Sequence, residues 1–68
     1  MKCYRVDVMY KTIPYKLFPY FFLARSAQAV AKATGFERKA IFKCTKTEAL
    51  KSGRHIDIVK GNKLTEVL

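Results

Sequence analysis

The chain has 68 residues, half of them hydrophobic, with three glycines and two prolines. This composition excludes a disordered or low-complexity protein and predicts one small globular domain, although a chain of this length buries only about 60% of its unfolded surface. Fourteen Lys and Arg oppose five Asp and Glu, which gives a net charge of +9. We therefore expect the partner to be an acidic macromolecule, either a protein surface or a nucleic acid.

The N-terminal residues predict no secretion signal, because charged side chains interrupt any apolar run. The longest apolar stretch, residues 17–24, is far shorter than the ~20 residues that span a bilayer. We expect a cytoplasmic protein that binds no membrane, in the host cytoplasm if it is viral. Cys3 and Cys44 can form one bridge at most, and we expect them to be reduced core residues.

Residues 2–10 predict a β-strand, because aromatic and β-branched side chains recur at every second position. The side chains on this face are Tyr4, Val6, Val8 and Tyr10. Residues 11–14 predict a turn, and residues 15–25 return as the second strand of a hairpin. Pro19 cannot donate to a ladder, so it indicates an edge position or a bulge.

Both faces of this second strand are apolar. One face carries Phe18, Tyr20 and Phe22, and the other carries Leu17, Phe21 and Leu23. One layer of core covers only one face of a strand. We therefore expect another chain, either a second copy in a homodimer or a target protein, to cover the remaining face. Phe18, Tyr20 and Phe22 are the residues expected at this protein interface.

Residues 27–34 predict a short helix. Ser26 is a good N-cap, and Gly35 stands where a left-handed C-cap belongs. Phe36 would then fold back on the helix. A helix of two turns is unstable alone, so its alanine-rich face is expected to pack on the sheet.

Residues 38–47 fit either a strand or a helix, and their isoleucine, phenylalanine and threonines favour the strand. Residues 47–53 predict a single helical turn that Thr47 caps. The predicted order is β-β-α-β-β-β. The fold class is therefore α+β, with a small antiparallel sheet and one short helix packed on it.

Residues 56–60 and 63–68 predict a final hairpin. The dipeptide Gly61-Asn62 between them fits a type II′ turn. The predicted pairs in this register are Val59 with Leu64, Ile56 with Val67, and Asp57 with Glu66. The last pair joins two like charges and weakens the hairpin.

Basic residues are dense between residues 38 and 46. They are Arg38, Lys39, Lys43 and Lys46. On a strand, Lys39 and Lys43 share a face. We expect these four residues, together with Lys16 and Arg25 beside the aromatic strand, to bind the acidic partner.

No combination of residues predicts catalysis, a metal site or a cofactor. Two distant cysteines and one histidine do not make a zinc site, and no glycine-rich phosphate loop is present. We expect a protein that is not an enzyme. An alternative is a small ribonuclease-type toxin in which His55, beside Arg54, acts as a general acid or base on RNA.

Two non-enzymatic functions fit these features. The first is a small basic protein that docks on or inhibits a larger protein or nucleoprotein complex. Its size and element order are similar to those of small bacteriophage proteins that block host machinery. The second is a nucleic-acid-binding module in which strand aromatics stack on bases and a basic face binds phosphates. The two-sided apolar strand favours the first function.

Overall fold

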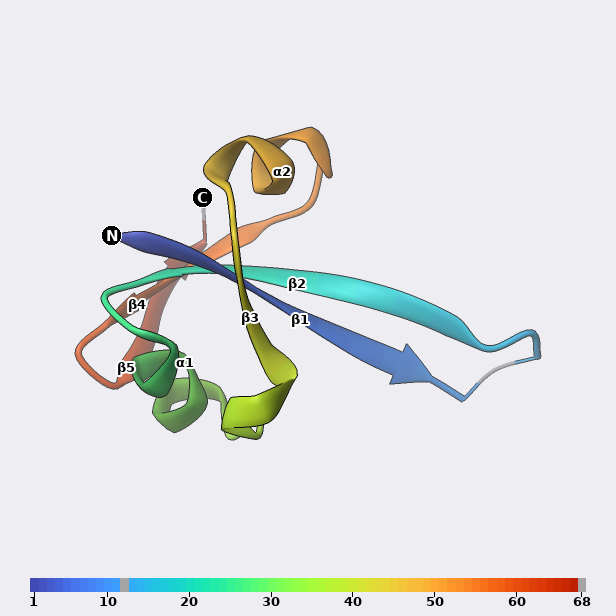
Figure 1. The fold of residues 1–68 in the computed structure, drawn as a ribbon, viewed down its shortest axis with the longest axis horizontal. Helices are drawn as coiled ribbons and strands as arrows, with labels where there is room; N and C mark the ends of the chain where they lie inside the picture. The colour runs from blue at the N-terminus through green and yellow to red at the C-terminus, as the bar shows by residue number, and fades with distance from the viewer. Residues whose placement is uncertain (12, 68) are drawn as a thin grey trace.

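The protein forms a five-stranded sheet with a helix on each face (Figure 1). The computed structural model describes residues 1–11 and 13–67, with side chains described as far as residue 64. The elements in chain order are β1 (Lys2–Tyr10), β2 (Lys16–Ala24), α1 (Ala27–Thr34), the 3-10 helix η1 (Arg38–Ala40), β3 (Ile41–Cys44), α2 (Lys46–Lys51), β4 (Ile56–Lys60) and β5 (Lys63–Val67). The strands lie in the order β3-β1-β2-β4-β5. The predicted α+β class is confirmed.

The sheet is mixed, so the prediction of a purely antiparallel sheet is wrong at one place. β2 and β4 pair in parallel, whereas the other three strand pairs in the described part of the chain are antiparallel. A parallel pair needs a long crossover connection. Residues 25–55 supply it, because the chain passes through α1, β3 and α2 before it returns beside β2.

α1 begins and ends at the predicted residues. The Ser26 hydroxyl accepts a hydrogen bond from the Ala29 amide at 3.2 Å. Gly35 has a φ of +83°, which is the left-handed conformation that glycine adopts most easily, and its amide donates to the Ala31 carbonyl at 2.9 Å. The small buried side chains of α1 let it lie close to the sheet. The first core, between α1 and the sheet, consists of Tyr4, Val6, Phe22, Ala24, Ala27, Ala29, Val30, Ile41 and Val59.

α2 lies on the opposite face of the sheet (Figure 1). Its Ala49 has no exposed surface and packs in a second core with Cys3, Phe21 and Ile56. An ion pair of 2.7 Å between Arg5 on β1 and Glu48 also joins α2 to the sheet. α2 therefore covers the face of β2 that carries Phe21, which is opposite to the face predicted to meet another chain.

The segment 38–47 is less regular than the predicted strand. Only residues 41–44 form β3, because a 3-10 helix precedes them and α2 begins at residue 46. Thr45 is the N-cap of α2, since its hydroxyl accepts from the Glu48 amide at 3.0 Å. The predicted helical turn is thus present but starts earlier, and the predicted cap at Thr47 is wrong.

The β4–β5 hairpin turns at Gly61, as predicted. Gly61 has a φ of +63°, and no non-glycine residue in the described chain has a positive φ, which fits a type II′ turn. The observed pairs include Val59 with Leu64 and Asp57 with Val67. The first pair was predicted. Between Ile58 and Val59 the register shifts, so the strand pairs farther from the turn differ from the prediction. The predicted partners of Ile56 and Asp57 are therefore wrong.

Ala49 provides a test of how α2 packs. We expect Ala49→Leu to lower the free energy of unfolding by about 1–3 kcal/mol, because leucine overfills a site with no exposed surface while keeping helix propensity. The neighbouring Leu50 is 70% exposed, so we expect Leu50→Ala to change the free energy of unfolding by less than about 0.5 kcal/mol. Urea unfolding measures both values. Equal effects of the two substitutions would show that α2 is not seated through Ala49.

Candidate interaction surface

The β1–β2 hairpin extends beyond the rest of the sheet (Figure 1). β1 and β2 pair along their whole lengths, from Lys2 opposite Ala24 to Tyr10 opposite Lys16. Among the described residues, β3 pairs with β1 only along residues 3–6, and β4 pairs with β2 only along residues 21–23. Residues 7–10 of β1 and 16–20 of β2 therefore form a two-stranded segment, which we call the ribbon, with residues 11 and 13–15 at its tip.

Pro19 lies in this ribbon, opposite Asp7. β2 is an inner strand of the sheet, but the part of it that carries Pro19 has a strand neighbour on one side only. This position satisfies the predicted edge location, because a proline here interrupts at most one ladder.

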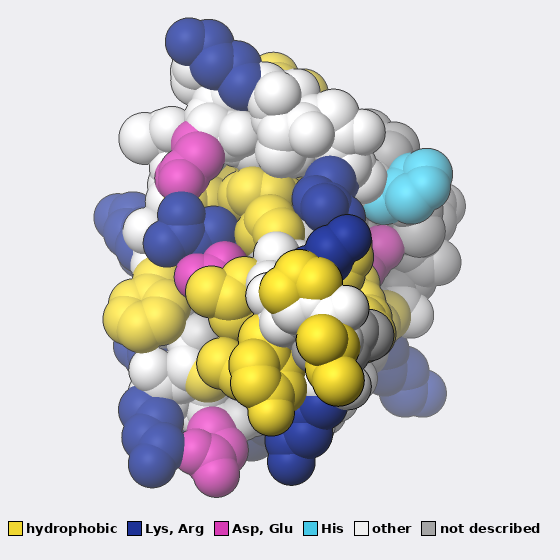
Figure 2. Space-filling view, turned by 90° about the vertical axis from the view of Figure 1, so that its right-hand side faces the viewer, with side chains coloured by type: hydrophobic (Ala, Val, Ile, Leu, Met, Phe, Trp, Pro, Cys, Tyr) yellow, Lys and Arg dark blue, Asp and Glu magenta, His cyan; other side chains and the backbone are white. Residues whose placement is uncertain are grey.

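The ribbon exposes large apolar side chains on both faces. The exposed ones are Met9, Tyr10, Ile13, Tyr15, Leu17 and Tyr20. Figure 2 views the molecule from the hairpin end and shows hydrophobic side chains gathered there, with Lys and Arg side chains at the margin. A contiguous apolar patch of this kind typically marks an interaction surface. A lone two-stranded hairpin is also only marginally stable in water, so burial against a partner would stabilise it.

Aromatic contacts order one face of the ribbon. The Tyr10 ring meets the Phe18 ring edge to face, with centroids 4.8 Å apart. The Tyr10 and Tyr20 hydroxyls share a hydrogen bond of 2.5 Å. The Arg54 guanidinium, from the loop before β4, lies 5.0 Å from the centre of the Phe18 ring. These contacts connect the ribbon to the body of the protein and occupy the Phe18 ring.

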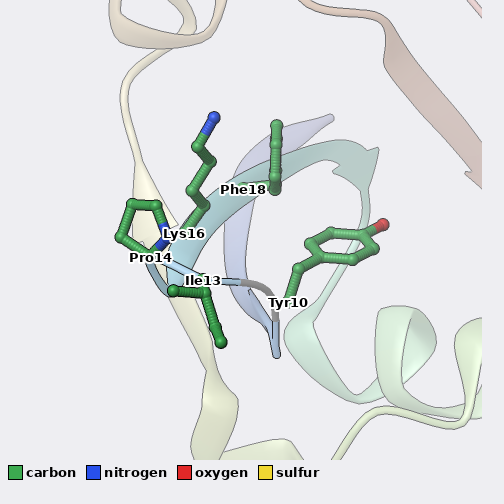
Figure 3. A pocket seen from close by; sticks show the side chains of 5 residues that line it. All are labelled: Tyr10, Ile13, Pro14, Lys16 and Phe18. Atoms are coloured by element: carbon green, nitrogen blue, oxygen red, sulfur yellow. The ribbon is translucent and has the colours of Figure 1, made fainter.

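A hollow at the tip of the ribbon has room for an apolar group. Its volume is about 460 Å³. Five residues line it, and Figure 3 shows them around the turn: Tyr10, Ile13, Pro14, Lys16 and Phe18. The lining is apolar except for the Lys16 ammonium and the Tyr10 hydroxyl. This hollow suits a hydrophobic side chain that has an acidic neighbour.

The ribbon is positively charged. No acidic residue occurs in the sequence between Asp7 and Glu37. Asp7 itself lies 3.4 Å from the Arg5 guanidinium, which offsets its charge. Lys11 and Lys16 are exposed. An acidic partner surface would therefore be attracted to the ribbon.

The structure separates the three aromatic residues that the sequence assigns to an interface. Phe18 and Tyr20 lie on the ribbon. Phe22 is only 2% exposed and belongs to the first core, beneath α1. Phe22 is therefore wrong as an interface residue of the folded chain, because the hairpin enters the sheet before that position.

The six predicted basic residues lie on or beside several different elements of the fold. Lys39 lies in η1, so it does not share a strand face with Lys43 as predicted, and it pairs with Glu37 at 3.4 Å. Lys43 lies on β3 opposite Tyr4, whereas Lys46 begins α2 on the other side of the sheet.

Three further basic residues are also dispersed. The Arg38 guanidinium donates to the Ile41 carbonyl at 3.3 Å. Lys16 begins β2, and Arg25 follows its last residue. Of the six residues, Lys16 is the one that lies on the ribbon.

A second hollow of about 490 Å³ opens where the loop before β4 diverges from β2. Its lining residues are Pro19, Tyr20, Gly53, Arg54, His55 and Asp57. The hollow thus brings Arg54 and His55, the two residues of the toxin alternative, to one surface. However, the His55 side chain is exposed and makes no hydrogen bond or ion pair with any described residue. General acid–base catalysis requires a positioned partner, so this hollow gives little support to the toxin alternative.

Other kinds of site receive no support from the described residues. No three His, Cys, Asp or Glu side chains among them lie together as a metal site would require. No helix among them is long and apolar enough to cross a membrane. Compared with protein-family models, curated proteins and solved structures, the chain gives no match. The geometry of the ribbon is therefore the basis for a functional proposal.

Two leucines on one face of β2 test whether the ribbon is free of the core. Leu17 is 61% exposed, so we expect Leu17→Ala to change the free energy of unfolding by less than about 0.5 kcal/mol. Leu23 packs on the second core, and Leu23→Ala should cost at least about 1 kcal/mol more. Urea unfolding of both variants gives the comparison. A large loss from Leu17→Ala would mean that the ribbon packs on the body.

The tyrosine pair gives a spectroscopic test of order in the ribbon. The hydrogen bond with Tyr10, followed by burial, raises the pKa of Tyr20 above its ordinary value. We expect Tyr10→Phe to lower the pKa of Tyr20, measured by ultraviolet titration of tyrosine ionisation. Tyr15→Phe removes another tyrosine of the hairpin and should leave this pKa unchanged. Identical titration of Tyr20 in both variants would show that the hydroxyl pair does not form.

Proposed function

We propose that this protein is a non-enzymatic binding protein that docks on a larger protein complex and inhibits it. The ribbon enters an apolar groove of the partner, and acidic residues at the rim of that groove meet its lysines. The observation that carries this proposal is the projecting ribbon, which exposes apolar side chains on both faces and carries no acid beyond Asp7.

The side chains at the ribbon tip supply the binding energy in this proposal. Ile13 is fully exposed and Leu17 is 61% exposed. Full burial of such a side chain contributes about 1.5–3 kcal/mol. A few apolar anchors of this size at the centre of an interface account for most of the affinity of many complexes. Lys11 and Lys16 then orient the encounter, since charges at the rim affect the association rate and specificity.

Binding of single-stranded nucleic acid is less well supported. Base stacking needs a free aromatic face. On the ribbon, Arg54 lies over the Phe18 ring, and Tyr10 packs against the same ring through an edge-to-face contact. Tyr20 is held by its hydroxyl and lies 6.5 Å from the Phe36 ring, centroid to centroid. The aromatic groups expected to stack on bases are thus already in contact with protein groups.

A second copy of the chain is also less well supported as the partner. The molecule carries a net charge of +9. A symmetric dimer through the ribbon would bring Lys11 and Lys16 of both copies together, and like charges in one interface disfavour association. An acidic partner removes this conflict.

Site-specific photocrosslinking tests the proposal. The photoreactive residue p-benzoylphenylalanine replaces Ile13 at the ribbon tip, or Asn62 at the tip of the β4–β5 hairpin as a matched control. In cells of the native source, the label at position 13 should form an adduct with another protein that nuclease treatment does not remove. The label at position 62 should not form it.

Binding of the captured protein, once purified, then tests the chemistry. We expect Leu17→Asp or the double change Lys11→Glu and Lys16→Glu to weaken it at least about tenfold, because the first removes an anchor and the second reverses the rim charge. Nuclease-sensitive adducts, adducts with a second copy, or equal capture from both positions would each contradict the proposal.

A further inference from the structure

The two cysteines lie side by side although they are 41 positions apart in the sequence. Cys3 on β1 and Cys44 on β3 are direct partners in the antiparallel register of these strands. Their sulfur atoms are 3.0 Å apart, with the Cys44 thiol donating to the Cys3 sulfur, and both thiols are free. Two cysteines that only filled the core would not need to bring their sulfur atoms into contact.

We propose that Cys3 and Cys44 form a redox site that a low-molecular-weight disulfide, such as oxidised glutathione, converts into one intramolecular disulfide between β1 and β3. The register makes this bond feasible, because directly opposed residues of neighbouring antiparallel strands have Cα atoms about 4.5–5.5 Å apart, within the range that disulfides span.

The reaction takes place in two exchange steps. The thiolate of one cysteine attacks a sulfur of glutathione disulfide, whose S–S bond breaks, and one glutathione leaves and takes up a proton. The second cysteine then loses its proton and attacks the protein sulfur of this mixed disulfide, which releases the second glutathione as a thiol. Two electrons pass from the protein thiols to the glutathione sulfurs, and two protons accompany them.

The surroundings of the pair favour a slow, intramolecular reaction. Cys3 is only 3% exposed, so the half-buried Cys44 is the sulfur that an oxidant reaches first. Burial, together with the hydrogen bond that the Cys44 thiol donates to Cys3, raises the pKa of Cys44 to about 12. Little thiolate is therefore present at neutral pH, and the rate of oxidation should rise as the pH increases. Buried sulfurs also do not readily join two protein molecules.

The bond would fix the least supported strand of the sheet. β3 has four residues and is an edge strand that, within the described chain, pairs with β1 alone. η1 and α2 flank it, and these short elements carry the basic segment 38–46. A disulfide from Cys44 to Cys3 would hold this segment against the sheet and restrict the unfolded chain through a long closed loop.

The redox equilibrium of the full chain tests the proposal. The protein is equilibrated with mixtures of reduced and oxidised glutathione, once in native buffer and once in denaturing urea. Acid quenching and intact mass spectrometry then measure the disulfide, which differs from the dithiol by two hydrogens. We expect folding to favour the intramolecular disulfide at least about tenfold over the unfolded chain. The melting temperature of the oxidised form should be higher than that of the reduced form.

Two results would overturn this inference. One is a native disulfide that is no more favoured than in urea, and the other is a native product that is mainly a glutathione adduct or a cross-linked dimer. Cys44→Ser is the matched control, in which glutathione buffers should not change the melting temperature. The comparison between native and unfolded wild type decides the question even if this variant folds poorly.

Discussion

The strand pairs of this sheet differ in length, and this difference determines where the two cores form and where apolar side chains stay exposed. β1 and β2 pair over nine residues, whereas their outer neighbours pair only over residues 3–6 and 21–23. Where four strands lie together, the sheet is wide enough to seat a helix on each face, and both cores form there. Where only two strands remain, no described residue belongs to the buried part of either core, and large apolar side chains are exposed. The same hairpin is therefore structural at one end and available to a partner at the other.

Features that depend on near neighbours in the sequence could be predicted. The alternation in residues 2–10, the caps of α1 at Ser26 and Gly35, and the turn at Gly61 are each determined by the local backbone. The parallel pairing of β2 with β4 could not be predicted, because periodicity does not say which strands become neighbours. For a related reason, the sequence predicted only a helical turn at α2 and did not predict that α2 packs on the sheet. Its six residues have little helix stability alone, and what holds them is the contact of Ala49 with a face formed by distant strands.

The candidate site could not be predicted fully either, because it also depends on which distant strands become neighbours. Phe18, Tyr20 and Phe22 alternate identically in the sequence, yet Phe22 lies in the core and the other two lie on the ribbon. What separates them is the point at which β4 begins to pair with β2, which lies more than thirty residues later in the chain. The basic residues between 38 and 46 could not be placed for a similar reason, since Lys39 lies in a 3-10 helix and Lys43 on a strand rather than on one common strand. The exposure of Ile13 and Leu17 follows from the same pairing boundary and has no signature of its own in the sequence.

Pro19 has a consequence for the solubility of the hairpin. A ribbon with two open edges offers unpaired main-chain groups on both sides, and strands of other molecules can add to such edges and grow into aggregates. Pro19 lies within one of these open stretches and has no amide proton to give to an added strand. Lys11 and Lys16 at the tip add charge that repels a second copy in the same register. The ribbon can thus remain apolar enough to bind a partner while resisting extension of its own sheet by identical chains.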